Sequence, residues 1–342
     1  MAMWQRGSRH APRINLSSQG VYLLPYRKPV ATVIFACAAL TAAMACAQGY
    51  PVKPVRIVTT AAGGGSDFVA RLIAQGLTES LGQQTIVDNR GTLIAIEMGI
   101  KAPPDGYTLS SFGSTLWLLP LMQEKPAYDP VKDFAPITWA VTSPNIIVVH
   151  PSLPVKSVRD LIALAKARPG QLNYGTTGSG GSNHLAGELF KSMAGVDMVR
   201  INYKGASQSL ADLLGGQIQV MFPTPNSASS HVKSGRLKAL AVGSAQPSAL
   251  FPGLPSVAAS GLPGYESVAL YGMLAPAKTP MPLISRLSQD ISRFVNRTDL
   301  KEKLFSMGVE AVGSSPDEFA AAMRADIARM GKVIRDAGIK AD

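Results

Sequence analysis

The sequence predicts an α/β protein of two domains that share a ligand cleft. Apolar strand-like runs alternate with amphipathic helix-like runs from Tyr50 onward, a pattern typical of α/β layers. Removing an expected leader of 47 residues from the 342 leaves 295, which most simply form two domains. A strand, a glycine-rich loop and a helix follow one another twice, more than 100 residues apart, which suits one such loop in each domain.

The first 47 residues have the order of a secretory signal peptide. Five basic residues precede an apolar run from about Val30 to Ala45, and the small residues "ACA" end this run before Gln48. We therefore expect an exported protein whose mature chain begins near Gln48. Cys46 leaves open the alternative of a lipid-anchored protein.

Composition excludes several classes of function. Both cysteines, Cys37 and Cys46, lie in the leader, so a chain cleaved after Ala47 is expected to have no disulfide, thiol nucleophile or thiolate metal site. The net charge falls from +11 to +6 on cleavage, because the leader holds five basic residues and no acidic ones. The basic residues are scattered and not clustered with aromatics, which argues against a nucleic-acid partner and favours small anions.

The strand-like and helix-like segments follow one another along the chain. The helix after the first loop is expected to be capped by Ser66 or Asp67, a later helix by Ser157, and a third to begin at Ser207 or Ser209. The C-terminal tail is expected to form at least three helices. The expected strands are, in order, "VRIVTT", "QTIVDN", "TLSSFG", "NIIVVH", "LNYGTT", "QIQVMF" and "LKALAVG".

Both glycine-rich loops suit a small anion. A strand that passes through a glycine loop into a helix presents unpaired N–H groups and the positive end of the helix dipole. The first loop, "AAGGGSDF", lacks the lysine of a P-loop and the spacing of a dinucleotide fingerprint. The hydroxyls of the second, "GTTGSGGSNH", suit a planar carboxylate. We expect the two loops to share one small carboxylate; for either loop alone, a tight turn without a ligand is the alternative.

The signatures of catalysis are incomplete. Ser179 lies in "TGSGG", where Thr177 replaces the first glycine of a nucleophile elbow. His184 and Glu188 share a helix face, but no HExxH pattern accompanies them, so neither a metal nor another cofactor is expected. A hydrolase or isomerase is therefore the weaker alternative to a binding protein.

The ordered motifs resemble one known family. They include "YPVKPVRIVTTAAGGGSDFVARLIAQGL", "PPDGYTL", "YDPVKDFAPIT", "NYGTTGSGGSNHLAGELFK", "INYKGASQSLADLLGGQIQVMF" and "GLPGYE". From Tyr50 onward the chain is similar to the tripartite tricarboxylate transporter receptors, which are TctC-like or Bug periplasmic solute receptors. The resemblance implies a non-catalytic type II periplasmic binding protein, a monomer that delivers a small carboxylate to membrane permease subunits. A carboxylate sensor for a signalling partner is the alternative, and the identity of the carboxylate does not follow.

The resemblance also implies the domain boundaries and the ligand-binding residues. Domain 1 is expected to comprise residues 50–149 and 272–342 and domain 2 residues 150–271, with "NIIVVH" and "VALYGML" crossing between them. Lys204 follows Tyr203 in the matching "YKG" turn. The implied ligand-binding residues are Thr60, Ala61, Ala62, Gly63, Gly64, Ser66, Asp67, Ser114, Thr115, Thr176, Thr177, Gly178, Ser179, Ser182, His184, Tyr203 and Thr224.

Three departures from the family pattern bear on the ligand. Thr59 and Thr60 stand where the family usually has proline and an aromatic residue, which implies a more polar pocket wall. Pro223 stands where an aspartate commonly follows the strand, and loss of this carboxylate disfavours a ligand with a free amino group. "DNR" leads into "GTLIAIEMG", which is shorter and more apolar than the usual glycine-rich run.

Overall fold

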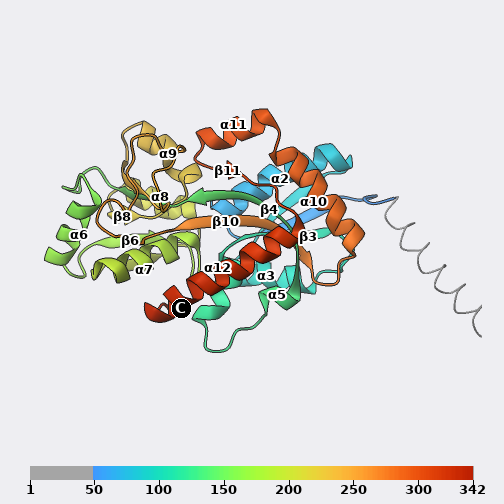
Figure 1. Cartoon of the computed structure of the whole chain (residues 1–342), viewed down its shortest axis with the longest axis horizontal. Coiled ribbons are helices and arrows are strands. Elements are labelled where there is room, and N and C mark those ends of the chain that lie inside the picture. Colours follow the sequence, from blue (N-terminus) through green and yellow to red (C-terminus); the bar gives the residue numbers. More distant parts are fainter. Residues whose placement is uncertain (1–48, 342) are drawn as a thin grey trace, which may run out of the picture. The chain divides into compact units, whose positions relative to one another are not determined.

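Two β-sheets, each covered by helices on both faces, organise the computed structural model, which describes residues 49–341 (Figure 1). Residues 50–342 form one compact unit. We call the part around the first sheet lobe 1 (residues 50–144 and 268–341) and the part around the second lobe 2 (residues 145–267). The predicted signal peptide and Cys46 lie outside the described residues. Within residues 49–341, no helix is long and apolar enough to cross a membrane.

The sheet of lobe 1 has six strands in the order β11-β4-β10-β3-β1-β2. The strands are β1 (Val55–Thr59), β2 (Thr85–Asn89), β3 (Thr108–Gly113), β4 (Phe134–Pro144), β10 (Val268–Pro276) and β11 (Glu310–Ala311). β1 pairs in parallel with β2 and β3, whereas β10 runs antiparallel to β3 and β4. The carboxyl ends of β1, β2 and β3 therefore lie at one edge of the sheet.

Helices cover both faces of this sheet. They are α2 (Gly65–Leu81), α3 (Thr92–Lys101), α4 (Thr115–Leu118), the 3-10 helix η1 (Leu119–Met122), α5 (Pro130–Asp133), α10 (Met281–Val295), α11 (Thr298–Ser306) and α12 (Pro316–Asp336). Ile57 and Leu109 pack with α2 and α10, whereas Val58 and Phe112 pack with α3, α4 and α12. Strand side chains alternate between faces, so strands that are apolar on both faces require this double cover.

Lobe 2 repeats the arrangement with five strands in the order β7-β6-β8-β5-β9. The strands are β5 (Ile146–Val149), β6 (Asn173–Thr176), β7 (Val199–Asn202), β8 (Val220–Met221) and β9 (Lys238–Val242). α6 (Val158–Ala167) and α7 (Ser182–Ala194) pack in one core, and α8 (Ala206–Leu214) and α9 (Pro225–Lys233) in the other. β6 is parallel to β7 and β8, so these three strands also end at one edge.

The chain changes sheets at Asn145 and at Ser267. Asn145 separates β4 from β5, and Ser267 directly precedes β10. The Asn145 N–H donates to the Ser267 carbonyl at 2.9 Å, and the Ser267 hydroxyl donates to Asn145 Oδ1 at 2.9 Å, so the two crossings lie side by side. The sequence placed the boundaries at 149/150 and 271/272, and the division into two domains stays a prediction.

Each of the seven expected strand segments contains a strand, and the tail contains the three long helices α10, α11 and α12. The hydroxyl of Ser157 accepts the N–H of Asp160 at 3.1 Å and caps α6, as predicted. The expected start of α8 is wrong, because the N-cap is Gly205 and the helix begins at Ala206.

The predicted cap of α2 is also wrong. Gly64 is the N-cap residue, so Ser66 and Asp67 already lie within the first turn. The carboxylate of Asp67 instead accepts the N–H of Gly63 at 2.9 Å and fixes the loop that leads into the helix.

Candidate ligand-binding site

The strand ends of the two lobes meet at one cavity, which we call the inner pocket. Loops after β1, β2 and β3 line it from lobe 1, and loops after β6, β7 and β8 line it from lobe 2. Ligands of α/β proteins commonly bind outside the carboxyl ends of the strands. The inner pocket has a volume of about 70 Å³. Since roughly 10–15 Å³ already admits one water molecule, it has room for a carboxylate and a short length of carbon chain.

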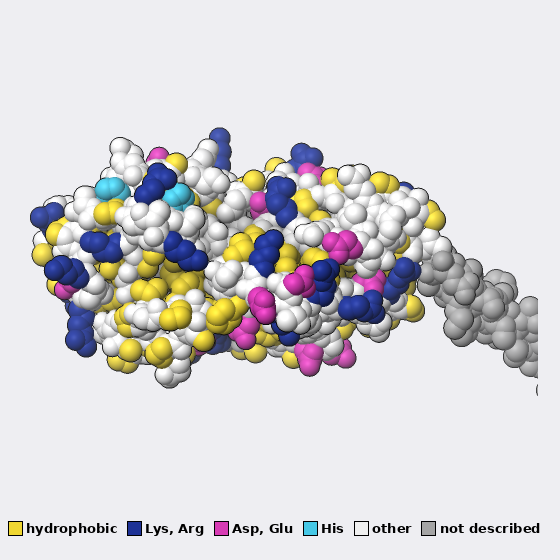
Figure 2. Space-filling view, turned by 90° about the horizontal axis from the view of Figure 1, so that it is seen from above, with side chains coloured by type: hydrophobic (Ala, Val, Ile, Leu, Met, Phe, Trp, Pro, Cys, Tyr) yellow, Lys and Arg dark blue, Asp and Glu magenta, His cyan; other side chains and the backbone are white. Residues whose placement is uncertain are grey.

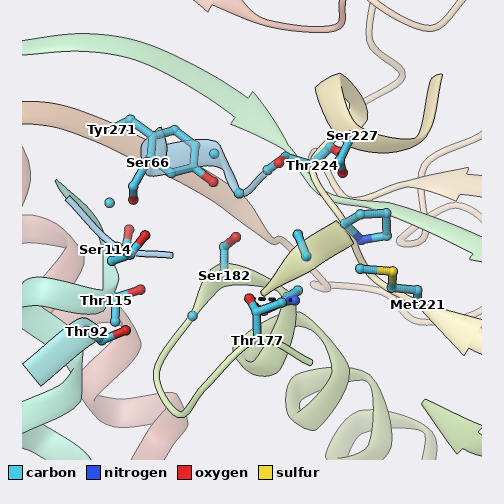
Figure 3. A pocket seen from close by; sticks show the side chains of 18 residues that line it. Ser66, Thr92, Ser114, Thr115, Thr177, Ser182, Met221, Thr224, Ser227 and Tyr271 are labelled. Atoms are coloured by element: carbon cyan, nitrogen blue, oxygen red, sulfur yellow. Dashed lines mark hydrogen bonds between the residues drawn. The ribbon is translucent and has the colours of Figure 1, made fainter. Parts of the chain in front are cut away.

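Hydroxyl groups from both lobes line the inner pocket (Figure 3). They belong to Thr60, Ser66, Thr92, Ser114, Thr115 and Tyr271 of lobe 1 and to Thr177, Ser182, Thr224 and Ser227 of lobe 2. No residue that lines this pocket carries a charged side chain. Among residues 49–341, no group of three His, Cys, Asp or Glu side chains lies close enough to hold a metal. A bound anion would therefore be stabilised by neutral dipoles.

Five helices of eight or more residues begin at the inner pocket. Their N-cap residues are Gly64 of α2, Gly91 of α3, Gly181 of α7, Gly205 of α8 and Thr224 of α9, and no side chain caps any of them. Side chains cap α5, α6 and α12, whose first residues do not line the pocket, whereas α10 and α11, which also begin elsewhere, have no side-chain cap. The first-turn N–H groups of a helix have no partner within the helix, so the uncapped helices leave donors available to an anion.

Ser114 provides an independent indication of a ligand. Ser114 is 6 % exposed and lines the inner pocket, and its hydroxyl has no hydrogen-bond partner among residues 49–341. Leaving a buried hydroxyl without a partner costs about 1–3 kcal/mol, and such groups in native proteins usually have a specific explanation. A ligand with acceptor oxygens would supply the missing partner.

Tyr271 of β10 closes the inner side of the pocket. Burial raises the pKa of its phenol above the ordinary value, and hydrogen bonds with Ser182 and Thr224 offset this effect only in part. The hydroxyl is therefore protonated at neutral pH and can donate to an anion. A Cβ on Gly65 would lie 2.1 Å from Tyr271 Oη, so a glycine at this position makes room for the phenol beside the start of α2.

Internal hydrogen bonds hold the second glycine-rich loop in shape. The Gly178 N–H donates to Asn202 Oδ1 at 2.8 Å, and the Gly180 N–H donates to His184 Nδ1 at 3.1 Å. Gly178 has a φ of +76° and Gly180 a φ of +78°, in a region that other residues rarely adopt. Asn183 Nδ2 donates to the Thr177 hydroxyl at 3.2 Å and orients it at the pocket (Figure 3).

A larger cavity, which we call the vestibule, continues from the inner pocket. It has a volume of about 670 Å³. The residues shared by the two cavities are Thr60, Gly64, Thr92, Thr177 and Ala206. A ligand can therefore place one end in the inner pocket and extend into the vestibule.

The two lobes touch around these cavities along a line of close contacts that we call the seam. A Cβ on Gly63 would lie 2.4 Å from Ser207 Oγ, and a Cβ on Gly205 would lie 3.3 Å from the Ala62 carbonyl oxygen. Atoms of the two lobes thus approach as closely as glycine allows. The two lobes are therefore in direct contact beside these cavities, and we call this arrangement closed.

The structure brings most of the predicted site residues together. Those that line the inner pocket are Thr60, Gly64, Ser66, Ser114, Thr115, Thr177, Ser182 and Thr224. Those that line the vestibule alone are Ala61, Ala62, Gly178 and Tyr203. Those that line neither cavity are Gly63, Asp67, Thr176, Ser179 and His184. The role of all these residues in ligand binding stays a prediction.

The sequence predictions did not name several lining residues, among them Thr92, Ser227 and Tyr271. Thr92 follows the same pattern of strand, glycine and helix as the two loops that were named, and this pattern was the available signal. Tyr271 lies in a segment expected to cross between the domains, but its place at the pocket depends on pairing with Gly113 of β3. No local pattern reveals this pairing.

Comparisons with known proteins show which protein family this chain resembles. Residues 69–339 match the model described as tripartite tricarboxylate transporter family receptor, TctC. Protein BugT of Bordetella pertussis is 33% identical over 314 residues, which cover 90% of this chain and 96% of that protein. Two similar structures are Rpa4515 of R. palustris with adipate and MatC of Rhodopseudomonas palustris with bound malate. Rpa4515 is 35% identical with a TM-score of 0.82, and the match covers 85% of this chain and 99% of that one. MatC is 27% identical with a TM-score of 0.79, and the match covers 83% of this chain and 100% of that one.

Proposed function

Because this chain belongs to the tripartite tricarboxylate transporter receptor family, TctC, we propose that it captures a small organic carboxylate in the periplasm and delivers it to a membrane permease. Members of the family are solute-binding receptors, and the chain is a receptor and not an enzyme. Similar structures described as periplasmic support the proposed location. Adipate and malate, bound by Rpa4515 and MatC, are both dicarboxylates.

Within the inner pocket, the proposed mode of binding uses neutral donors only. One carboxylate of the ligand lies in the inner pocket, where it accepts hydrogen bonds from first-turn N–H groups of α2 and α7 and from the Ser114 hydroxyl. Charge-assisted hydrogen bonds of this kind are roughly twice as strong as neutral ones, and fixed dipoles in a closed pocket need no reorganisation. The buried hydroxyl of Ser114 without a partner is the observation that carries this proposal.

The lining also favours ligands without an amino group. No Asp or Glu lines the inner pocket or the vestibule, and Pro223 lines the inner pocket at the position where the family commonly has aspartate. An ammonium group needs an anionic or well-placed acceptor partner when it is buried. We therefore expect simple organic acids to bind more tightly than amino acids of the same size.

A thermal-shift screen of mono-, di- and tricarboxylates against the mature protein and Ser114→Ala tests the proposal. At a ligand concentration about 100 times the dissociation constant, binding adds roughly 2.7 kcal/mol of stability, which raises the melting temperature by several degrees. Ser114→Ala should weaken binding roughly 5- to 150-fold. It should not lower the stability of the ligand-free protein, because the hydroxyl has no partner there.

Ser110→Ala is the matched control. Ser110 lies in the same region of lobe 1, on β3, is fully buried and also has a hydroxyl without a partner, but it does not line the pocket. Its substitution should leave affinity unchanged. If both variants bind the hit as tightly as the wild type, or if no carboxylate shifts the melting temperature, the proposed site is wrong.

A further inference from the structure

The inner pocket and the vestibule differ in charge. No charged side chain lines the inner pocket, whereas Arg90 and Lys204 line the vestibule together with neutral residues. No Asp or Glu lines the vestibule. A ligand that extends from one cavity into the other therefore passes from a neutral region into a positive one.

The two cations are not equally available. Arg90 is held by Asp88, with Arg90 Nε 2.7 Å from Asp88 Oδ1 and Nη2 3.3 Å from Oδ2. The guanidinium of Arg90 therefore already has a carboxylate partner. Lys204 is exposed and forms no ion pair within the part of the chain that the structure describes. Its ammonium group can turn to a new partner without breaking an existing one.

Contacts of the two neighbouring residues fix the backbone of Lys204 beside the vestibule. The Tyr203 N–H donates to the Thr176 carbonyl at 2.9 Å, and the Tyr203 hydroxyl donates to Asp212 Oδ2 at 2.7 Å. Gly205, the residue after Lys204, is the N-cap of α8 and lies at the seam. Lys204 is therefore held between two ordered residues, at the place where lobe 2 meets the first loop of lobe 1.

We propose that Lys204 binds the second carboxylate of an α,ω-dicarboxylate whose first carboxylate occupies the inner pocket. This inference rests on the proposed function and names the substrate class and the residue that selects it. A chain of several methylene groups carries the second carboxylate past the residues that the two cavities share, so this group lies in the vestibule. Affinity should rise with chain length until this group reaches the ammonium of Lys204.

Paired ligands isolate the contribution of the second carboxylate. Dissociation constants are measured by calorimetry for α,ω-dicarboxylates from succinate to azelate and for the monocarboxylate of the same chain length, such as hexanoate for adipate. The ratio of the two constants gives the preference for the second charge. In Lys204→Met this ratio should fall about 10-fold for the preferred chain length, the loss expected for one hydrogen bond to a charged group. Lys204→Arg should retain most of the preference.

Two variants separate a local contact from general attraction. Lys166→Met removes another exposed charge of the same lobe, on α6 and away from the vestibule, and should leave the ratio unchanged. Arg90→Gln should reduce the ratio less than Lys204→Met does, because Arg90 already forms an ion pair with Asp88. The preference should also weaken at high ionic strength.

The outcomes distinguish this inference from the proposed function. If Lys204→Met binds both members of each pair as the wild type does, or if Arg90→Gln alone removes the preference, Lys204 does not hold the second carboxylate, and the receptor assignment stands. If no carboxylate of any length binds the wild type, both proposals fail. Since Lys204 is exposed and unpaired within the described residues, its variants should unfold at the wild-type temperature.

Discussion

Asp67 directly follows a residue that lines the inner pocket, yet its carboxylate serves other partners. It accepts hydrogen bonds from the Gly63 N–H at 2.9 Å and from Asn89 Nδ2 at 2.8 Å, and it pairs with Arg71 Nε at 2.9 Å. Asn89 Nδ2 also donates to the Thr60 carbonyl at 2.8 Å. Asp67 therefore ties the first loop to the end of β2, and its charge is compensated outside the pocket.

The same contacts determine how Asp67 titrates. Burial raises the pKa of this carboxyl group, but the hydrogen bonds from Gly63, Asn89 and Arg71 outweigh burial and leave the pKa below its usual value. A lowered folded-state pKa contributes stability that is present above the unfolded pKa of about 3.9 and is lost as the pH falls through the folded value.

Asp67→Asn should therefore lower the free energy of unfolding at pH 7 by about 2 kcal/mol, the worth of hydrogen bonds to a charged group. The difference from the wild type should persist at pH 5 and shrink below about pH 4. Urea unfolding at pH 7 and pH 3 measures it. Asp336→Asn, which breaks an exposed pair with Lys332 on α12, is the control and should cost at most about 1 kcal/mol. Equal losses in the two variants would contradict the role given to Asp67.

At the scale of elements, the helices divide by how their N-termini are satisfied. α6 and α12 are capped by Ser157 and Ser315, whereas α2 and α7 begin after Gly64 and Gly181 at the inner pocket without a side-chain cap. A capping side chain would occupy the N–H groups that we assign to the ligand. α10 and α11, which begin away from the pocket, also lack a side-chain cap, so it is the position of α2 and α7 at the pocket that fits an anion site.

Substitutions of Gly64 test whether a side chain at this N-cap weakens binding of the carboxylate. Gly64 has φ −90° and ψ 176°, which other residues adopt easily, and a Cβ there would meet no atom within 4 Å. Asn and Asp cap helices about equally well, so Gly64→Asn and Gly64→Asp should fold with wild-type stability or slightly more. Gly64→Asp should bind the carboxylate at least about 30-fold more weakly than Gly64→Asn, since it adds a like charge. Calorimetric titration of both variants with the same ligand measures this ratio; a ratio near one would place the anion elsewhere.

The sequence predicts elements well where local chemistry decides them. The short β-branched runs that became β1, β2 and β5, and the cap of α6 by Ser157, require no knowledge of distant residues. The two glycine loops were found for the same reason. What local chemistry cannot give is the partner of Asp67, because Asn89 lies 22 residues away, or the place of Tyr271 at the pocket.

β4 shows a second limit. Its segment, "FAPITWAVTSP", contains Pro136 and Pro144, which argue against a strand inside a sheet. In the structure β11 covers only Val141 and Thr142 of β4, so Pro136 lies where the outer edge of β4 has no strand partner. Proline is tolerated there because no N–H is needed for a ladder, and only the tertiary structure reveals this edge.

At the scale of the whole molecule, the seam makes closure sensitive to single atoms. Gly205 has φ −163° and ψ 160°, extended values that valine adopts without strain, but its side chain would press on the Ala62 carbonyl of the other lobe. Such a substitution acts against the closed arrangement and spares the fold of each lobe.

Gly205→Val should therefore weaken ligand binding about 10-fold, because the apparent affinity falls with the population of the closed form. Small-angle scattering should show a smaller radius of gyration when ligand saturates the wild type, and a reduced change in the variant. Gly91→Val is the control: Gly91 is also an N-cap beside the vestibule, but the nearest atom to its Cβ is Ile94 Cδ1 at 3.9 Å. If both variants close and bind equally, contact at the seam does not limit closure.

The uncapped glycine N-termini also bear on how such a receptor can change its ligand over evolutionary time. On the proposed mode of binding, the carboxylate is recognised largely by main-chain amides, which every residue except proline carries. Substitutions of Lys204 or its neighbours in the vestibule can then alter which carbon chain is accepted beyond the carboxylate. The inner pocket still binds the carboxylate itself. A lineage could move from one organic acid to another by single steps, each of which still binds some acid, without passing through a protein that binds none.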